Sequence, residues 1–304
     1  MFNFYEVDTL VQDSGSFWLS LLITILGTLL GFLGAFYLTK LSEKKQYKKD
    51  KQFKVSAYQD RLRYLVQLIE SSISILNRQL SNFEKLSDEV MADLTEQHFL
   101  KIIASNDLER LQKMDTEEVF HAYHLIIPES EEKIKNYKNI YGAIDYLYLR
   151  LKQAIESTEK QVGYIHRDQM YIKETIESLS NVMYARIKNI EAKGETSSSE
   201  HSFLVKHHKV YMALIEDRSE IGNYEVDFLL PFGNELRVSF KASEFFGELN
   251  DFIAKAIIRF NHIKENSTVF ANELKDVRKE MKNSIERLTK INEEITCHNT
   301  SYTA

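Results

Sequence analysis

The chain has 304 residues, of which 28% are charged, and its formal net charge at pH 7 is −6. Residues 1–16 hold three acidic side chains, and residues 40–54 hold seven lysines against two acids, so residues 55–304 carry a net charge of −8. That acidity excludes a protein that binds nucleic acid through its overall charge. The single cysteine, Cys297, excludes an intramolecular disulfide and a cysteine-based metal cluster.

One long uncharged stretch, residues 17–39, stands near the N-terminus. As a helix, these 23 residues are about 34 Å long, enough to cross a hydrocarbon core of about 30 Å. A cleaved signal peptide would need a basic start, a shorter apolar core and a small-residue cleavage site, whereas this stretch follows acidic residues and precedes lysines. The sequence therefore predicts an uncleaved, single-pass transmembrane helix at 17–39.

The charges on either side of this stretch predict its orientation. Positive charge is retained on the cytoplasmic side of a cell membrane, so we expect segment 1–16 outside and the C-terminal domain in the cytoplasm. The basic juxtamembrane segment 40–54 acts either as a topology signal alone or also as a contact for anionic membrane lipid, and the two roles are compatible. Its lysines are Lys40, Lys44, Lys45, Lys48, Lys49, Lys51 and Lys54.

Small residues gather on one side of the predicted membrane helix. At about 100° per residue they fall within about 120° of one another, while large apolar residues fill the remainder and only Leu38 intrudes. Small residues are common in membrane helices, but a small-xxx-small ladder also lets two backbones approach closely. We therefore expect a homo-oligomer, or pairing with another membrane protein, through a small-residue stripe. The stripe consists of Ser20, Thr24, Gly27, Thr28, Gly31, Gly34 and Ala35.

The remaining chain has two prolines and few glycines, which favours long helices. Apolar residues at heptad spacing mark 55–86 and again 270–295, and we expect these two helices to pair in antiparallel fashion. The first stripe is broad and interrupted at Ser72 and Gln79, which favours a bundle helix with several neighbours. Further helices are predicted at 94–104, 107–114, 115–127, 134–155, 170–190 and after Ser243.

Two segments interrupt this helical pattern. The polar run 193–202 predicts a linker between a first helical part, 55–192, and a second, 203–296, which is followed by a tail at 297–304. Alternating apolar residues on either side of a Pro-Phe-Gly-Asn turn predict a β-hairpin at 224–240. The fold class is therefore mainly α: a single transmembrane helix followed by an elongated cytosolic helical bundle or coiled-coil domain with one small β-hairpin insertion.

Two groups of side chains are candidates for chemistry. His121 and His124 share a helix face, but a metal would need further ligands, so a structural pair is the favoured interpretation and no metal is assigned. Tyrosines are frequent between Tyr123 and Tyr184, and they indicate either a bundle core or a groove for a partner helix.

The predicted hairpin offers the other candidate. Asp227 and Glu235 are spaced loosely like the acidic residues of a metal-dependent nuclease hairpin, with Arg237 or Lys241 as the basic residue. An exposed hairpin face explains the same alternation and is the favoured interpretation. We find no phosphate-binding loop or nucleophile motif, so no catalytic residue is assigned and no cofactor is expected.

These observations support three function hypotheses. The first is a membrane-anchored, oligomerising interaction or sensory module whose cytosolic helical domain binds a protein partner. The second is a membrane-perturbing effector, of the class found in bacterial defence against phage, which is an analogy of architecture alone. The third is a membrane-tethered, metal-dependent nuclease that uses the hairpin carboxylates.

Overall fold

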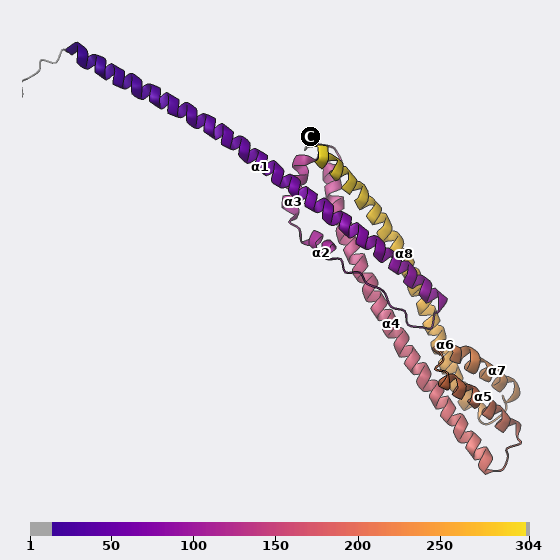
Figure 1. Cartoon of the computed structure of the whole chain (residues 1–304). Helices are drawn as coiled ribbons and strands as arrows, with labels where there is room; N and C mark the ends of the chain where they lie inside the picture. The colour runs from indigo at the N-terminus through magenta and orange to yellow at the C-terminus, as the bar shows by residue number, and fades with distance from the viewer. Residues whose placement is uncertain (1–13, 302–304) are drawn as a thin grey trace, which may run out of the picture. The chain divides into compact units, whose positions relative to one another are not determined.

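The computed structural model describes the backbone of residues 14–301 and the side chains of residues 19–299. Most of the predicted extracytoplasmic segment 1–16 and the end of the predicted tail 297–304 lie outside these residues. The described residues form helices and connecting loops and contain no strand (Figure 1). The chain divides into two compact units, Met1–Arg61 and Leu62–Ala304.

The first unit contains the beginning of helix α1, which spans Ser14–Ala92 in all. No proline or glycine interrupts residues 40–54, so the helix continues through the lysine-rich segment. Every side chain from Leu19 to Lys54 is exposed within this unit.

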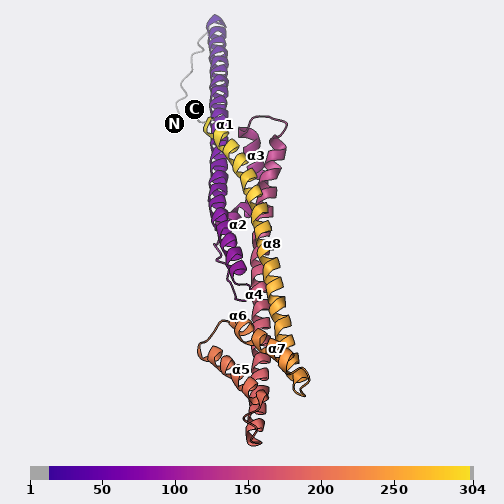
Figure 2. The same ribbon diagram turned by 90° about the vertical axis from the view of Figure 1, so that its right-hand side faces the viewer.

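The second unit is a helical bundle built on two long antiparallel helices, α4 (Lys133–Ala192) and α8 (Phe246–Ser301), which lie side by side in both ribbon views (Figures 1 and 2). The end of α1, from Leu62, packs on them through buried heptad residues such as Leu65, Ile69 and Leu76. Two short helices, α2 (Asn106–Lys113) and α3 (Thr116–Ile126), pack against α4.

The predicted antiparallel pairing of the two heptad segments is confirmed. Ser87 Oγ donates to the Ala271 carbonyl oxygen at 2.9 Å, and Arg278 Nη2 lies 2.8 Å from Glu84 Oε2. Residue numbers rise along α1 while they fall along α8, so the two helices run in opposite directions.

Beyond the end of α1, four short elements pack on the other end of α4 and the beginning of α8. They are α5 (Ser199–Glu216), α6 (Ile221–Asn223), the π-helix η1 (Tyr224–Leu229) and α7 (Leu230–Ser239), which we call the cap. Their core is aromatic: Phe203, Phe228 and Phe232 are buried, and the rings of Phe228 and Phe232 stack at 5.7 Å.

The predicted β-hairpin at 224–240 is wrong, because these residues form η1 and α7. Phe228, Phe232 and Leu236 recur every four residues and are buried together, which is a helical period. Pro231 stands in the first turn of α7, where proline is tolerated. Gly233 makes no turn; it allows close packing, since an added Cβ would lie 3.2 Å from Ile253 Cγ2.

A short helix predicted at 94–104 is also absent from the described residues, where 93–105 are irregular. Side chains of α1 satisfy the backbone of this segment instead: Gln79 Oε1 accepts from the Ile103 N–H at 2.9 Å, and Asn82 Nδ2 donates to the Lys101 carbonyl oxygen at 2.7 Å. Gln79 thus interrupts the heptad stripe because its amide holds a neighbouring chain segment.

The lengths of α4, α8 and the predicted linker also differ from prediction. The two helices predicted at 134–155 and 170–190 are one helix, α4, and α8 likewise joins two predicted segments and continues into the predicted tail. Only 193–198 of the predicted linker is irregular, since Ser198 caps α5 by accepting from the His201 N–H at 3.1 Å.

Candidate functional site

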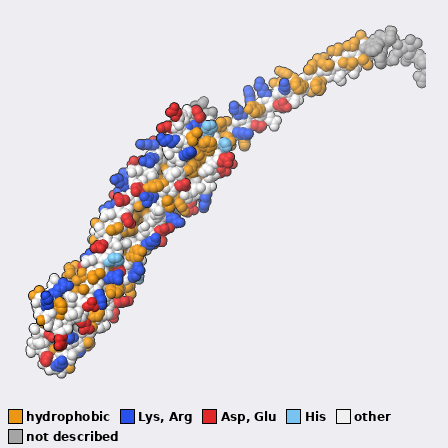
Figure 3. Space-filling model, turned by 180° about the vertical axis from the view of Figure 1, so that it is seen from behind, with side chains coloured by type: hydrophobic (Ala, Val, Ile, Leu, Met, Phe, Trp, Pro, Cys, Tyr) orange, Lys and Arg blue, Asp and Glu red, His pale blue; other side chains and the backbone are white. Residues whose placement is uncertain are grey.

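One helix in the described part of the chain is long and apolar enough to cross a membrane, and it begins near the N-terminus. Its large apolar side chains are strongly exposed, including Leu30 at 66% and Phe32 at 73%. Figure 3 shows them as a run of hydrophobic side chains next to the grey residues. Exposed apolar surface costs about 25 cal/mol per Å² in water, so transfer of this segment to an apolar environment is energetically favourable.

The small-residue stripe lies on this helix. A Cβ added to any of its three glycines would meet no atom within 4 Å, so the backbone is open to a second helix there. The threonine hydroxyls bond the backbone of their own helix. Thr24 Oγ1 donates to the Ser20 carbonyl oxygen at 2.8 Å, and Thr28 Oγ1 donates to the Thr24 carbonyl oxygen at 2.7 Å. Because these two protons are already bonded within the helix, Thr24 and Thr28 contribute close packing to the stripe rather than free hydroxyl donors.

The lysines of segment 40–54 follow on the same helix and are all exposed. Lys40 Nζ lies 5.0 Å from the centre of the Phe36 ring, at the end of the apolar stretch. Their exposure leaves these charges available to anionic surfaces, and their role as a lipid contact or topology signal stays a prediction.

A groove runs between α4 and α8 in the second unit. Three hollows follow one another along it: the first two share Glu280, and the first and third share Lys160 and Glu273. Most of its lining side chains are polar or charged, and small or apolar residues lie among them: Ala154 and Leu274 in the first hollow, and Gly142, Ala143 and Ile291 in the second. We call this continuous surface the α4/α8 groove.

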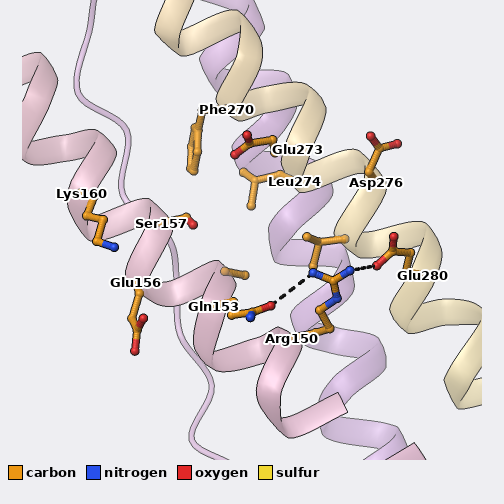
Figure 4. A pocket seen from close by; sticks show the side chains of 12 residues that line it. Arg150, Gln153, Glu156, Ser157, Lys160, Phe270, Glu273, Leu274, Asp276 and Glu280 are labelled. Carbon is orange, nitrogen blue, oxygen red and sulfur yellow. Dashed lines mark hydrogen bonds and ion pairs between the residues drawn. The ribbon is translucent and has the colours of Figure 1, made fainter. Parts of the chain in front are cut away.

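A hydrogen-bonded cluster crosses the groove where its first two hollows meet (Figure 4). Glu280 on α8 accepts from the Tyr146 hydroxyl at 2.7 Å, and Arg150 on α4 binds the same carboxylate oxygen while also donating to Gln153 Oε1 at 3.2 Å. The Tyr146 hydrogen bond and Arg150 hold the pKa of the Glu280 carboxyl below its ordinary value.

The two halves of the groove differ in charge. Lys135, Arg287 and Lys290 line one end. Two acidic residues, Glu132 and Glu294, lie next to this part of the groove but do not line it. Glu132 lies 3.9 Å from Lys135, and Glu294 accepts a hydrogen bond from Asn136 at 3.2 Å.

The middle of the groove is acidic. Glu156, Glu273 and Asp276 line the first hollow, against Lys160. The third hollow, at the other end, shares Lys160 and Glu273 and adds no further acidic side chain to its lining. Arg150 and Glu280 neutralise each other where the basic and acidic parts meet.

The residues of the nuclease hypothesis do not form a common site. Asp227 is exposed on η1, whereas Glu235 on α7 is bonded by Lys206 Nζ at 2.6 Å and by His207 Nε2 at 2.9 Å. Arg237 Nε donates to Asn250 Oδ1 at 3.2 Å, and Lys241 lies exposed beyond the end of α7. Without the hairpin, the nuclease hypothesis has lost its geometric basis.

His207 and His208 are adjacent in the sequence, which predicts that both are surface residues; for His207 this is wrong, because its side chain is buried in the cap. Its ring lies 5.0 Å from each of Phe203 and Phe232, and its Nδ1 is buried with no hydrogen-bond partner among the described residues. Burial lowers the pKa of His207 despite the neighbouring carboxylate, and the hydrogen bonds from Lys206 and His207 lower that of Glu235. This cluster holds α5 against α7.

The other candidates take structural positions. His121 lies 3.9 Å from Glu117 on the surface, and His124 stacks on Phe120 at 5.8 Å. No group of three or more potential metal ligands occurs in the part of the chain that the structure describes. The tyrosines take two kinds of position: Tyr123 is core, where burial raises its pKa to about 12, while Tyr146 lines the α4/α8 groove, whose use by a partner helix stays a prediction.

A polar belt, which the sequence pattern does not predict, crosses the middle of the second unit. Asp168 of α4 is buried and accepts from His262 Nδ1 at 2.7 Å and Arg259 Nη1 at 3.3 Å, both on α8. Gln169 Nε2 donates to the Thr95 carbonyl oxygen at 2.7 Å, which fastens the chain after α1 to α4. These side chains continue the three- and four-residue spacing of Leu151 and Ile155, a signal that could have revealed the continuous helix.

No protein-family model matches the chain, and the comparisons with curated proteins and with solved structures give no match.

Proposed function

We propose that this protein is a membrane-anchored, oligomerising interaction or sensory module with its helical domain in the cytoplasm, where that domain binds a protein partner. The observation that carries the proposal is the exposure of every side chain from Leu19 to Lys54, of which the first twenty are mostly large and apolar. A helix of this length and composition is stable when lipid covers it. Acidic residues before it and lysines after it give the orientation.

Association of copies in the membrane follows from the small-residue stripe. Lipid tails are as apolar as leucine, so helices associate in membranes by packing closely, and glycine permits the closest approach. The open space around the glycines of the stripe supports this role. The stripe lies on one side of the helix, so it favours one contact geometry over many.

A membrane-perturbing effector is the second candidate. A pore needs polar groups that face a water path, whereas the Thr24 and Thr28 hydroxyls donate to the backbone of their own helix. This arrangement favours an anchor over a pore. Release of a vesicle-trapped dye by the full chain would reverse that preference.

The experiment compares Gly31→Ile with Leu29→Ile in a membrane-helix association assay. The first change places a branched side chain in the stripe and should weaken association, while the second lies on the opposite side of the helix and should have little effect. Both variants should float with vesicles as the wild type does. Equal effects of the two substitutions would refute the stripe, and failure of the wild-type chain to float would refute the anchor.

A further inference from the structure

The α4/α8 groove lies on the side of the helix pair that faces away from α1. Ala271 and Arg278 of α8 bond α1, whereas the groove residues Glu273, Asp276 and Glu280 occupy another side of α8 at about 100° per residue. In Figure 4 the paler ribbon of α1 passes behind α4 and α8, and the lining side chains stand between these two helices. One side of the pair is therefore covered by the chain itself and the other is open.

The dimensions of the open side suit an α-helix. The groove follows α4 from Lys135 to Tyr164, which is about 44 Å at 1.5 Å per residue, or about eight helical turns. With α1, α4 and α8 forming three members of a bundle, a helix in this groove would be the fourth. Gly142 and Ala143 on the groove wall let another backbone approach closely, and an added Cβ at Gly142 would meet nothing within 4 Å.

The charges of the groove indicate which kind of helix can bind in it. Three basic side chains line one half of the groove, and three acidic side chains with one lysine line the other half, where they gather in the middle hollow. Complementary potentials across an interface fix the register of a partner and exclude wrong ones. A matching helix carries acidic residues where it passes Arg287 and Lys290, and basic residues where it passes Glu273 and Asp276.

We propose that the α4/α8 groove binds one amphipathic helix of another protein, about 28 residues long, with a small or apolar stripe and with its acidic and basic residues segregated into opposite halves. This inference deepens the proposed function, on which it rests for the existence of a protein partner. A second copy of this chain, bound in the opposite direction, is the competing occupant, and the Gly142→Cys variant below distinguishes it from another protein.

The test uses the full chain in lipid nanodiscs and two synthetic helical peptides of about 28 residues with identical composition and the same apolar stripe. One peptide has its acidic and basic residues segregated into halves, and the other has them interleaved. We expect the segregated peptide to bind about tenfold more tightly, because several charge pairs become complementary at once. Equal affinities, or no binding of either peptide at about millimolar concentration, would overturn the proposal.

Two pairs of matched variants test the location. Charge reversal at Lys135, Arg287 and Lys290 should abolish the preference for the segregated peptide, while reversal at Lys138, Lys275 and Lys282, exposed on other sides of the same helices, should preserve it.

The second pair tests steric access. Gly142→Phe should block binding and Gly163→Phe should not, since both positions have open space around the Cβ but only Gly142 lines the groove. Equal effects of the two variants within either pair would refute the location. Efficient disulfide formation between two copies of the Gly142→Cys variant would also overturn the proposal, because it would indicate that a second copy occupies the groove.

The two proposals fail in different measurements. Vesicle flotation and the Gly31→Ile comparison test the anchor and the stripe, and neither involves the groove. Loss of peptide discrimination in a chain that floats and associates would refute the groove inference alone.

Discussion

Ser87 and Ala271 are 184 residues apart in the chain, yet the Ser87 hydroxyl donates a 2.9 Å hydrogen bond to the Ala271 carbonyl oxygen inside the core of the second unit. Serine in the middle of a helix often bonds its own backbone. Here the hydroxyl bonds the neighbouring helix instead, which fixes the register between the end of α1 and the middle of α8. Both helices are therefore integral to the bundle.

The first prediction concerns the contribution of α8 to stability. Met281 of α8 is fully buried, and Met281→Ala should lower the free energy of unfolding by about 2–5 kcal/mol through lost burial and the cavity that remains. The neighbouring exposed residue gives the control, since Lys282→Ala should change it by less than about 0.5 kcal/mol. Urea unfolding of the full chain in nanodiscs, followed by circular dichroism, measures both. Similar midpoints for the two variants would show that α8 is not part of the core.

The terminal helices could be predicted from the sequence because their cores are apolar and periodic. Leu65, Ile69, Met281 and Ile285 are large apolar residues at helical spacing, and all four are buried. The middle of α4 was missed because its core is polar there. Asp168 occupies a position where periodicity calls for an apolar residue, and only its hydrogen bonds to α8 make burial favourable.

The predicted hairpin failed for a different reason. Pro231 and Gly233 are turn residues in most contexts, and the sequence alone does not distinguish a turn glycine from one that permits close packing against Ile253. The candidate sites also differ in whether the sequence alone predicts them. The apolar stretch is local and could be predicted, whereas the α4/α8 groove joins residues more than 100 positions apart and required the fold.

The second prediction compares two glycines. Gly142→Ala should raise the free energy of unfolding by about 0.5–1 kcal/mol, because alanine favours the helix and its Cβ meets nothing. Gly233→Ala should instead be neutral or destabilising, since its Cβ would lie 3.2 Å from Ile253 Cγ2 and that buried side chain must shift. Urea unfolding ranks the two variants. A greater stability of Gly233→Ala than of Gly142→Ala would contradict the packing role of Gly233.

The third prediction concerns topology. A reporter fused after Ala304 should behave as a cytoplasmic protein, because lysines follow the apolar stretch and acids precede it. Replacing the seven lysines of segment 40–54 by glutamine should reduce the fraction of chains in this orientation. The measurement is reporter activity with a matched fusion at the N-terminus as the opposite control. An extracytoplasmic reporter at Ala304 in the wild-type chain would refute the orientation.

The fourth prediction is that acidification destabilises the cap through His207. Burial lowers the pKa of His207 in the folded protein below its ordinary value of 6.5, so protonation favours the unfolded state. The stabilising contribution of the neutral ring is fully present above about pH 6.5 and is lost as the pH falls through the lower pKa of the folded protein. Glu235 adds nothing in this range, because its pKa is lowered from 4.5 and its own contribution is lost only at more acidic pH.

Thermal melting at pH 7.5, 6.5 and 5.5 tests this assignment. The wild-type melting temperature should fall between pH 7.5 and 5.5, and His207→Gln should reduce that fall, since glutamine can still donate to Glu235 but does not titrate. His208 retains part of the effect, because burial lowers its pKa as well. His121→Gln is the matched control on the surface and should melt with the wild-type pH dependence. If His207→Gln kept the full pH dependence while His121→Gln removed it, the sensitivity would belong to the surface histidine and not to the cap.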